Sequence, residues 1–181
     1  MKNKKKIIIL SVLAVIAASA FFAVPKIPVL SISGKKVSYG NFLKIKGALE
    51  KFNDVSNVNL GDDLAQIALL NLIEQEFLDV LIDGADRNIL FESEKIVDEA
   101  IERTPNLALD KASDELYGLS AEDFKRLVLF PQAKRDLLDR HFQEKGQDIL
   151  QSWASLYGTA SIKVYYPGYY WDTTEYTIKK K

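Results

Sequence analysis

Few residues in this sequence could carry out acid–base or nucleophilic chemistry. The 181 residues include a single histidine, His141, and no cysteine. A hydrolytic triad would need His141 as its base, with Asp136 or Asp139 orienting it toward a serine. However, His141 lies in an amphipathic helical pattern, where a histidine at the edge of the core or partly exposed is the simpler interpretation. The sequence therefore predicts no catalytic residue.

The acidic pairs are the next candidates for chemistry. Asp62-Asp63 and Asp98-Glu99 could hold a metal ion or act in general acid–base catalysis. The first pair is better explained by capping of the helix that follows, and the second lies on the polar face of an amphipathic helix. The absence of cysteine excludes a disulfide scaffold and thiolate-bound metal, and the glycines form no phosphate-binding loop. We predict no metal, no cofactor and no enzymatic activity.

The charge distribution divides the chain at residue 24. Residues 1–24 hold four lysines and no acidic residue, whereas residues 25–181 hold 20 basic and 25 acidic residues, a net charge of −5. Proteins bind nucleic acid largely through lysine and arginine at the phosphates, so an acidic domain is poorly suited to it. Nucleic acid is therefore not an expected partner.

Residues 1–24 are predicted to be a signal-anchor or a signal peptide. A basic segment, residues 1–6, precedes 18 uncharged residues, 7–24. Eighteen helical residues span about 27 Å, close to the hydrocarbon thickness of about 30 Å, which favours an uncleaved anchor in the cytoplasmic membrane. Ala18-Ser19-Ala20 also fits a signal-peptidase site, and cleavage after Ala20 would release the protein. In both cases the folded domain is extracytoplasmic, because the basic flank stays inside.

The elements that follow predict a mainly α-helical domain over residues 25–166. We expect about six orthogonally packed helices, with caps at Ser38, Asp63 and Ser120 and an interruption at Phe130-Pro131. A short strand at 28–32 and another at 161–166 are expected to form a small two-stranded pairing between the N-terminal and C-terminal segments. Residues 167–181 form an aromatic and lysine-rich tail, which we expect to be flexible beyond Trp171.

The helix predicted from residue 63 to about residue 87, with Asn88 ending it, is unusually apolar. A helix packed on one side needs an apolar stripe about 100° wide, and this one is apolar around most of its circumference. It is either the central helix of the domain or, compatibly with that, part of it lines a groove for apolar polypeptide segments. The candidate groove residues are Leu69, Leu70, Ile73 and Phe77.

The aromatic residues concentrate near the C-terminus. Six of the eight tyrosines fall between residues 157 and 176. These rings could face a peptide or a sugar, seal the last strand onto the helices, or contact lipid headgroups. The candidate binding residues in this region are Tyr165, Tyr169, Tyr170 and Trp171.

The order of the elements resembles the N-terminal chaperone domain of SurA-type periplasmic proteins. The segment 30–42 resembles the opening strand, glycine turn and helix of that family. Residues 69–77 and 85–90 resemble its long helix, residues 93–101 the next helix, and residues 124–131 with 135–138 the closing helix pair. The resemblance covers most of residues 28–165. It implies a helical domain that holds unfolded, newly exported polypeptides, and whose N-terminal segment packs with a C-terminal helix.

The family often carries a parvulin-type prolyl isomerase module as well. Only 40 residues follow His141, too few for such a module, so the resemblance implies the chaperone part without the isomerase. The predicted function is ATP-independent binding of unfolded or newly exported polypeptides. The alternatives are a membrane-anchored structural or assembly subunit that binds one envelope partner and, less favoured, a residual peptidyl-prolyl isomerase. Exchange of the N-terminal strand would give a homodimer, which the sequence leaves open.

Overall fold

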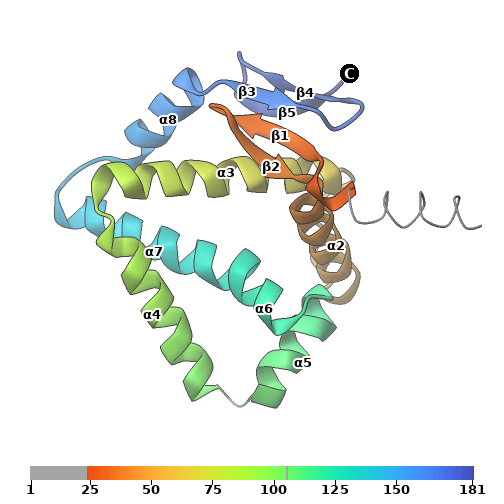
Figure 1. Cartoon of the computed structure of the whole chain (residues 1–181), viewed down its shortest axis with the longest axis vertical. Helices are drawn as coiled ribbons and strands as arrows, with labels where there is room; N and C mark the ends of the chain where they lie inside the picture. The colour runs from red at the N-terminus through yellow and green to blue at the C-terminus, as the bar shows by residue number, and fades with distance from the viewer. Residues whose placement is uncertain (1–23, 105) are drawn as a thin grey trace, which may run out of the picture.

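The computed structural model describes residues 24–104 and 106–181, and its strands gather at one end of a helical body (Figure 1). The predicted anchor, residues 7–24, lies outside the described residues except for Val24. Within the described ranges, no helix is long and apolar enough to cross a membrane. The described chain opens with a 3-10 turn, η1 (Val24–Lys26), followed by β1 (Pro28–Ile32) and β2 (Lys35–Ser38).

Helices make up most of the domain. They are α2 (Tyr39–Val55), α3 (Leu64–Ala85), α4 (Asn88–Arg103), α5 (Asn106–Tyr117), α6 (Ala121–Phe124), the π-helical turn η2 (Lys125–Leu129), α7 (Phe130–Glu144) and α8 (Ile149–Thr159). In the part that the structure describes, six of these helices have eleven or more residues. The predicted mainly α-helical fold is confirmed.

The strands form two small antiparallel sheets. In the first, β1 lies between β2 and β3 (Ile162–Val164), and Leu30 pairs with Val164, which confirms the predicted pairing of the N-terminal and C-terminal segments. β2 extends this sheet through a two-residue turn at Ser33-Gly34, where φ is 48° and 90°. Positive φ at both turn residues matches the right-handed twist of a two-residue hairpin.

The flexible tail expected beyond Trp171 is instead a second hairpin. β4 (Tyr169–Asp172) pairs with β5 (Thr177–Lys180), and Tyr169 and Ile178 are buried in the main core. The prediction was wrong because β5 carries two lysines and one apolar residue, a pattern too short to indicate a strand. The burial of Ile178 orders this hairpin.

The three predicted helix caps are confirmed, but one helix ends at a different residue than predicted. The side chains of Ser38, Asp63 and Ser120 each accept a backbone N–H at the start of α2, α3 and α6. α3 ends at Ala85, and Asn88 begins α4 instead of ending α3. The reason is that Asp86 adopts an extended backbone conformation and ends α3, while its carboxylate accepts the Asn88 N–H at 2.9 Å.

The predicted interruption at Phe130-Pro131 appears as a widened turn and not as a break. The Phe130 N–H donates to the Lys125 carbonyl, five residues back, and Pro131 then occupies the first turn of α7. A proline ring clashes with the carbonyl four residues before it in an α-helix, and the π-helical turn removes that clash. The chain therefore continues from α6 into α7 without a loop.

α3 is the central helix. It packs against α2, α7, α8, β1 and β5, so that the strands cover one side of it and α7 lies on the other (Figure 1). Its broad apolar circumference is explained by this position.

Candidate functional site

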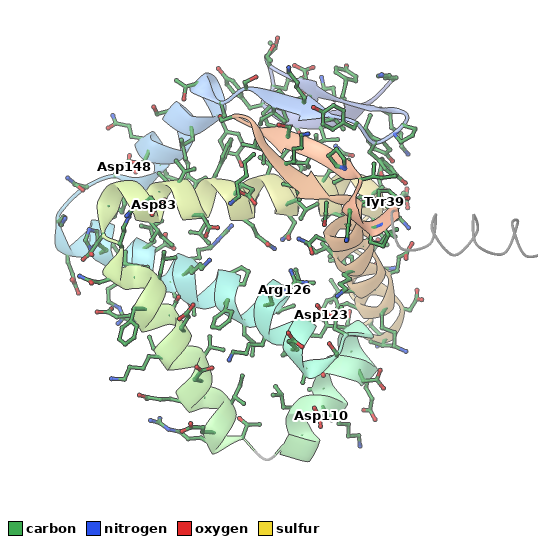
Figure 2. All side chains as sticks on the ribbon, in the orientation of Figure 1. Tyr39, Asp83, Asp110, Asp123, Arg126 and Asp148 are labelled. Atoms are coloured by element: carbon green, nitrogen blue, oxygen red, sulfur yellow. The ribbon has the colours of Figure 1, made fainter. Side chains whose placement is uncertain are left out.

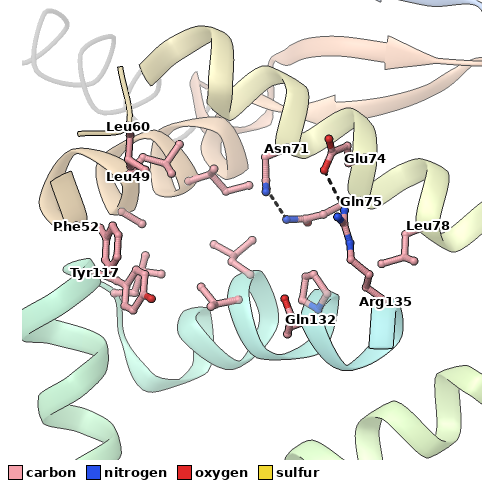
Figure 3. A pocket seen from close by; sticks show the side chains of 16 residues that line it. Leu49, Phe52, Leu60, Asn71, Glu74, Gln75, Leu78, Tyr117, Gln132 and Arg135 are labelled. Carbon is pink, nitrogen blue, oxygen red and sulfur yellow. Dashed lines mark hydrogen bonds and ion pairs between the residues drawn. The ribbon is translucent and has the colours of Figure 1, made fainter. Parts of the chain in front are cut away.

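A cleft of about 390 Å³ lies between α2, α3 and the segment that runs from the end of α5 into α7 (Figure 3). We call it the α2–α3–α7 cleft. Its apolar lining consists of Ile45, Ala48, Leu49, Phe52, Leu60, Leu78, Tyr117, Leu119, Leu127, Val128 and Pro131. Its polar lining consists of Asn71, Glu74, Gln75, Gln132 and Arg135.

The apolar floor of the cleft comes from helical spacing on α2 and from the π-helical turn. Ile45, Leu49 and Phe52 share one face of α2, since they lie three or four residues apart. At one end of the cleft the Phe52 ring stacks on Tyr117, with ring centroids 5.4 Å apart and planes 13° from parallel. Leu49, Phe52 and Val128 are only half-buried, so a ligand side chain can reach them.

The rim of the cleft carries three side-chain amides. Gln75 donates to Asn71 Oδ1 at 2.7 Å along α3, and Gln132 donates to Asp136 at 2.8 Å along α7. Among the described residues, Asn71 Nδ2, Gln75 Oε1 and Gln132 Oε1 make no hydrogen bond. An amide group can donate to a carbonyl or accept an N–H, so this rim can bind a peptide backbone of any sequence.

Two ion pairs hold α3 and α7 together beside the cleft. Arg135 contacts Glu74 at 2.9 Å, and Lys134 contacts Asp79 at 2.8 Å. The Arg135 guanidinium also lies over the Trp153 ring, 5.7 Å from its centroid. Because Arg135 and Glu74 neutralise each other, the charged lining of the cleft adds no net charge to it.

None of the four candidate residues predicted on α3 lines the cleft. Leu69, Ile73 and Phe77 are at most 1% exposed and pack in the main core. Leu70 is partly buried against the same core. In this conformation Leu69, Ile73 and Phe77 cannot touch a ligand, and the interpretation of this face as a groove is corrected to that of a core face.

The candidate aromatic residues divide into exposed and buried ones. Tyr165 and Tyr170 are 49% and 38% exposed. Tyr169 is buried and donates its hydroxyl to Asp63 at 2.8 Å. Trp171 is half-buried and stacks on Tyr157, with ring centroids 6.1 Å apart and planes 9° from parallel. Burial and the bond to Asp63 raise the pKa of Tyr169. None of these four lines the cleft.

The residues that do line the cleft on α3 left a signal in the sequence. Asn71 and Gln75 are four residues apart in a helix that is otherwise apolar on most sides. Their spacing puts both on one face, and Leu78 follows them on it. A polar interruption of an apolar helix therefore indicated the accessible face, whereas the most apolar residues indicated the core.

His141 is a half-buried residue of α7, and its Nε2 has no hydrogen-bond partner among the described residues. Asp136, one of its two possible orienting residues, instead accepts from Gln132. Within residues 24–104 and 106–181, no three histidine, aspartate or glutamate side chains converge.

We compared the chain with protein families, curated proteins and solved structures. No family model, no curated protein and no solved structure matches it.

Proposed function

We propose that the domain holds segments of non-native polypeptides in the α2–α3–α7 cleft, without ATP, on the extracytoplasmic side of the membrane. The observation that carries the proposal is the pairing of an apolar floor with an amide rim in one cleft. The floor takes an apolar side chain and the rim takes the backbone beside it.

Such a cleft distinguishes unfolded chains from folded ones by simple physical chemistry. Folded proteins bury their apolar side chains and pair their backbone groups, whereas unfolded chains expose both. Because amide side chains read the backbone and not the sequence, many different segments fit. A cleft of this size buries few side chains, so each segment binds weakly and leaves again without ATP.

The order of the elements supports the same function. The strand, turn and helix at the start of the domain, and the helix pair near its end, occur in the order that led to the resemblance to SurA-type chaperones. The resemblance implies that the N-terminal segment packs with a C-terminal helix, whereas β1 pairs with the strand β3, so this contact is not part of the support. We also propose that the domain is related to the SurA-type chaperones.

Aggregation suppression tests the proposal directly. We expect residues 25–181, at a near-equimolar ratio, to reduce the aggregation of several unrelated unfolded proteins. Val128→Asn places an amide on the apolar floor and is expected to abolish most of this effect. Val80→Asn is the matched control, because Val80 is 51% exposed and does not line the cleft. Circular dichroism and a cooperative melt establish that each variant is folded.

Two results would contradict the proposal. One is that the folded domain suppresses the aggregation of no client. The other is that Val128→Asn and Val80→Asn behave alike. Stoichiometric binding to one folded envelope protein, with no effect on unfolded clients, would instead favour a structural or assembly subunit.

A further inference from the structure

Basic and acidic residues are separated between the two ends of the domain. We call residues 25–38 and 160–181, which contain the five strands that the structure describes, the strand end. It has seven lysines and two acidic residues, whereas residues 88–117, in α4 and α5, have eight acidic and three basic residues. Figure 1 places the strands at one end and the junction of α4 with α5 at the other. Tyr39 lies beside the strands and Asp110 near the far end (Figure 2).

Several lysines of the strand end are not neutralised. Lys26, Lys36, Lys163 and Lys181 make no ion pair with any residue that the structure describes. Lys36 and Lys163 pair with the same residue, Ser31, from the two flanking strands. Residues that lie opposite each other across strands share a face of the sheet, so these two exposed ammonium groups stand on one face.

The strand end also exposes apolar and aromatic side chains. Ile27 is 52% exposed, Tyr165 49% and Tyr170 38%. Tyr165 is two residues from Lys163 and continues along β3, since its N–H donates to the Val29 carbonyl at 2.8 Å. Lysine and tyrosine together suit the boundary between water and lipid, because the rings enter the headgroup region while the ammonium groups meet the phosphates.

The point where the described chain begins lies at this end. A Cβ added to Gly40 of α2 would be 3.0 Å from the Pro25 carbonyl oxygen, and the Tyr39 N–H donates to the Ile27 carbonyl at 2.7 Å. The chain is therefore packed onto the domain from Pro25 onward. The sequence predicts that residues 7–24 enter the bilayer, and a chain packed in this way holds the strand end within reach of the headgroups.

We propose that the strand end is seated on anionic lipid headgroups of the membrane that residues 7–24 enter, with the junction of α4 and α5 directed away from it. Charge complementarity supports both halves of this orientation, since an anionic surface attracts the lysines and repels the acidic helices. The orientation concerns the surface of the domain and does not depend on what the cleft binds.

Because the chain has no cysteine, single cysteines can report this orientation in the full-length protein. Ser161→Cys places an uncharged, exposed site at the strand end, and Ala108→Cys places one near the junction of α4 and α5. Each is labelled with a fluorophore and exposed to acrylamide, a neutral aqueous quencher, on phosphatidylcholine vesicles with or without phosphatidylglycerol. We expect quenching at residue 161 to fall several-fold when phosphatidylglycerol is present, and quenching at residue 108 to stay unchanged.

Charge variants identify the cause of that protection. One lysine near an anionic surface changes membrane affinity about fivefold, so Lys36→Gln with Lys163→Gln should lower the ratio of seated to unseated domains about 25-fold and restore quenching at residue 161. Lys95→Gln with Lys111→Gln removes the same charge from α4 and α5 and should leave quenching unchanged. Equal quenching at residues 161 and 108 on phosphatidylglycerol would overturn the proposal. So would protection that persists without phosphatidylglycerol or in the Lys36 and Lys163 variant.

Discussion

The two faces of α3 differ in what they offer a ligand. The face toward the strands carries Leu69, Ile73 and Phe77, and all three are removed from solvent. The face toward α7 carries Asn71 and Gln75, and it borders the α2–α3–α7 cleft. A fully apolar face is covered by the rest of the same chain, whereas a face that mixes amides with apolar groups can stay open to water and still bind a ligand. The comparison teaches that the accessible face of a central helix is its less apolar one.

The largest effect on stability is expected from shortening a side chain on the buried face of α3. Phe77→Ala removes a ring that packs edge-on against Tyr157, with centroids 5.0 Å apart. We expect the free energy of unfolding to fall by about 3–5 kcal/mol, because a cavity forms in the core. Urea denaturation measures this loss. Client binding per folded molecule should not change, and a loss of binding in molecules shown to be folded would contradict the division between the faces.

A smaller effect is expected where the strands meet the start of α3. Burial opposes ionisation of Asp63, but hydrogen bonds from the Gln66 N–H, the Tyr169 hydroxyl and Lys180 outweigh it and lower its pKa below 3.8. A carboxyl whose pKa is lower in the folded state stabilises the protein above its unfolded pKa, and this stabilisation is lost as pH falls through the folded pKa. Asp63→Asn keeps a side chain that can cap the helix and removes the charge.

We therefore expect Asp63→Asn to cost about 1 kcal/mol at neutral pH, since the lost charge interactions are only partly buried. The difference from wild type should shrink as pH falls below 3.8. Urea denaturation across this pH range measures it. A difference that stays constant with pH would mean that the cap geometry, and not the charge, stabilises this junction.

The smallest effect on stability is expected at the cleft itself. Arg135 and Glu74 are 45% and 39% exposed, so Arg135→Ala should cost only about 0.5 kcal/mol. The same change opens the cleft beside Gln75, and a bound peptide should dissociate faster. Stopped-flow fluorescence of a labelled apolar peptide measures the rate. Arg140→Ala, on the same helix but outside the cleft lining, is the control and should leave the dissociation rate unchanged. If the peptide dissociates from both variants at the same rate, Arg135 does not contribute to the binding site.

Much of the fold could be predicted because its determinants are local. Ser38, Asp63 and Ser120 each cap the helix that begins beside them, and helical periodicity needs only neighbouring residues. The side of α3 that the strands would cover could not be predicted, because it depends on β1 and β5 from opposite ends of the chain. The cleft was missed for the same reason, since α2, α3 and the π-helical turn contribute to it from distant segments.

Predictions from local sequence patterns also failed where tertiary packing determined the structure. Pro131 carried a strong signal for interruption, but a π-helical turn absorbs the proline and keeps the backbone helical. Ile178 gave no strand pattern, yet its burial orders the last hairpin.

The pairing of β1 with β3 also sets the order of events when the chain is made. β1 is among the first parts of the domain to leave the ribosome and β3 among the last, so Leu30 cannot pair with Val164 until most of the domain has been synthesised. Contacts between such distant residues form slowly. Until they form, the edge of β1 that does not face β2 has unpaired backbone groups and is open to association with other nascent chains. A domain proposed to protect unfolded polypeptides is thus itself exposed to aggregation until β3 has been synthesised.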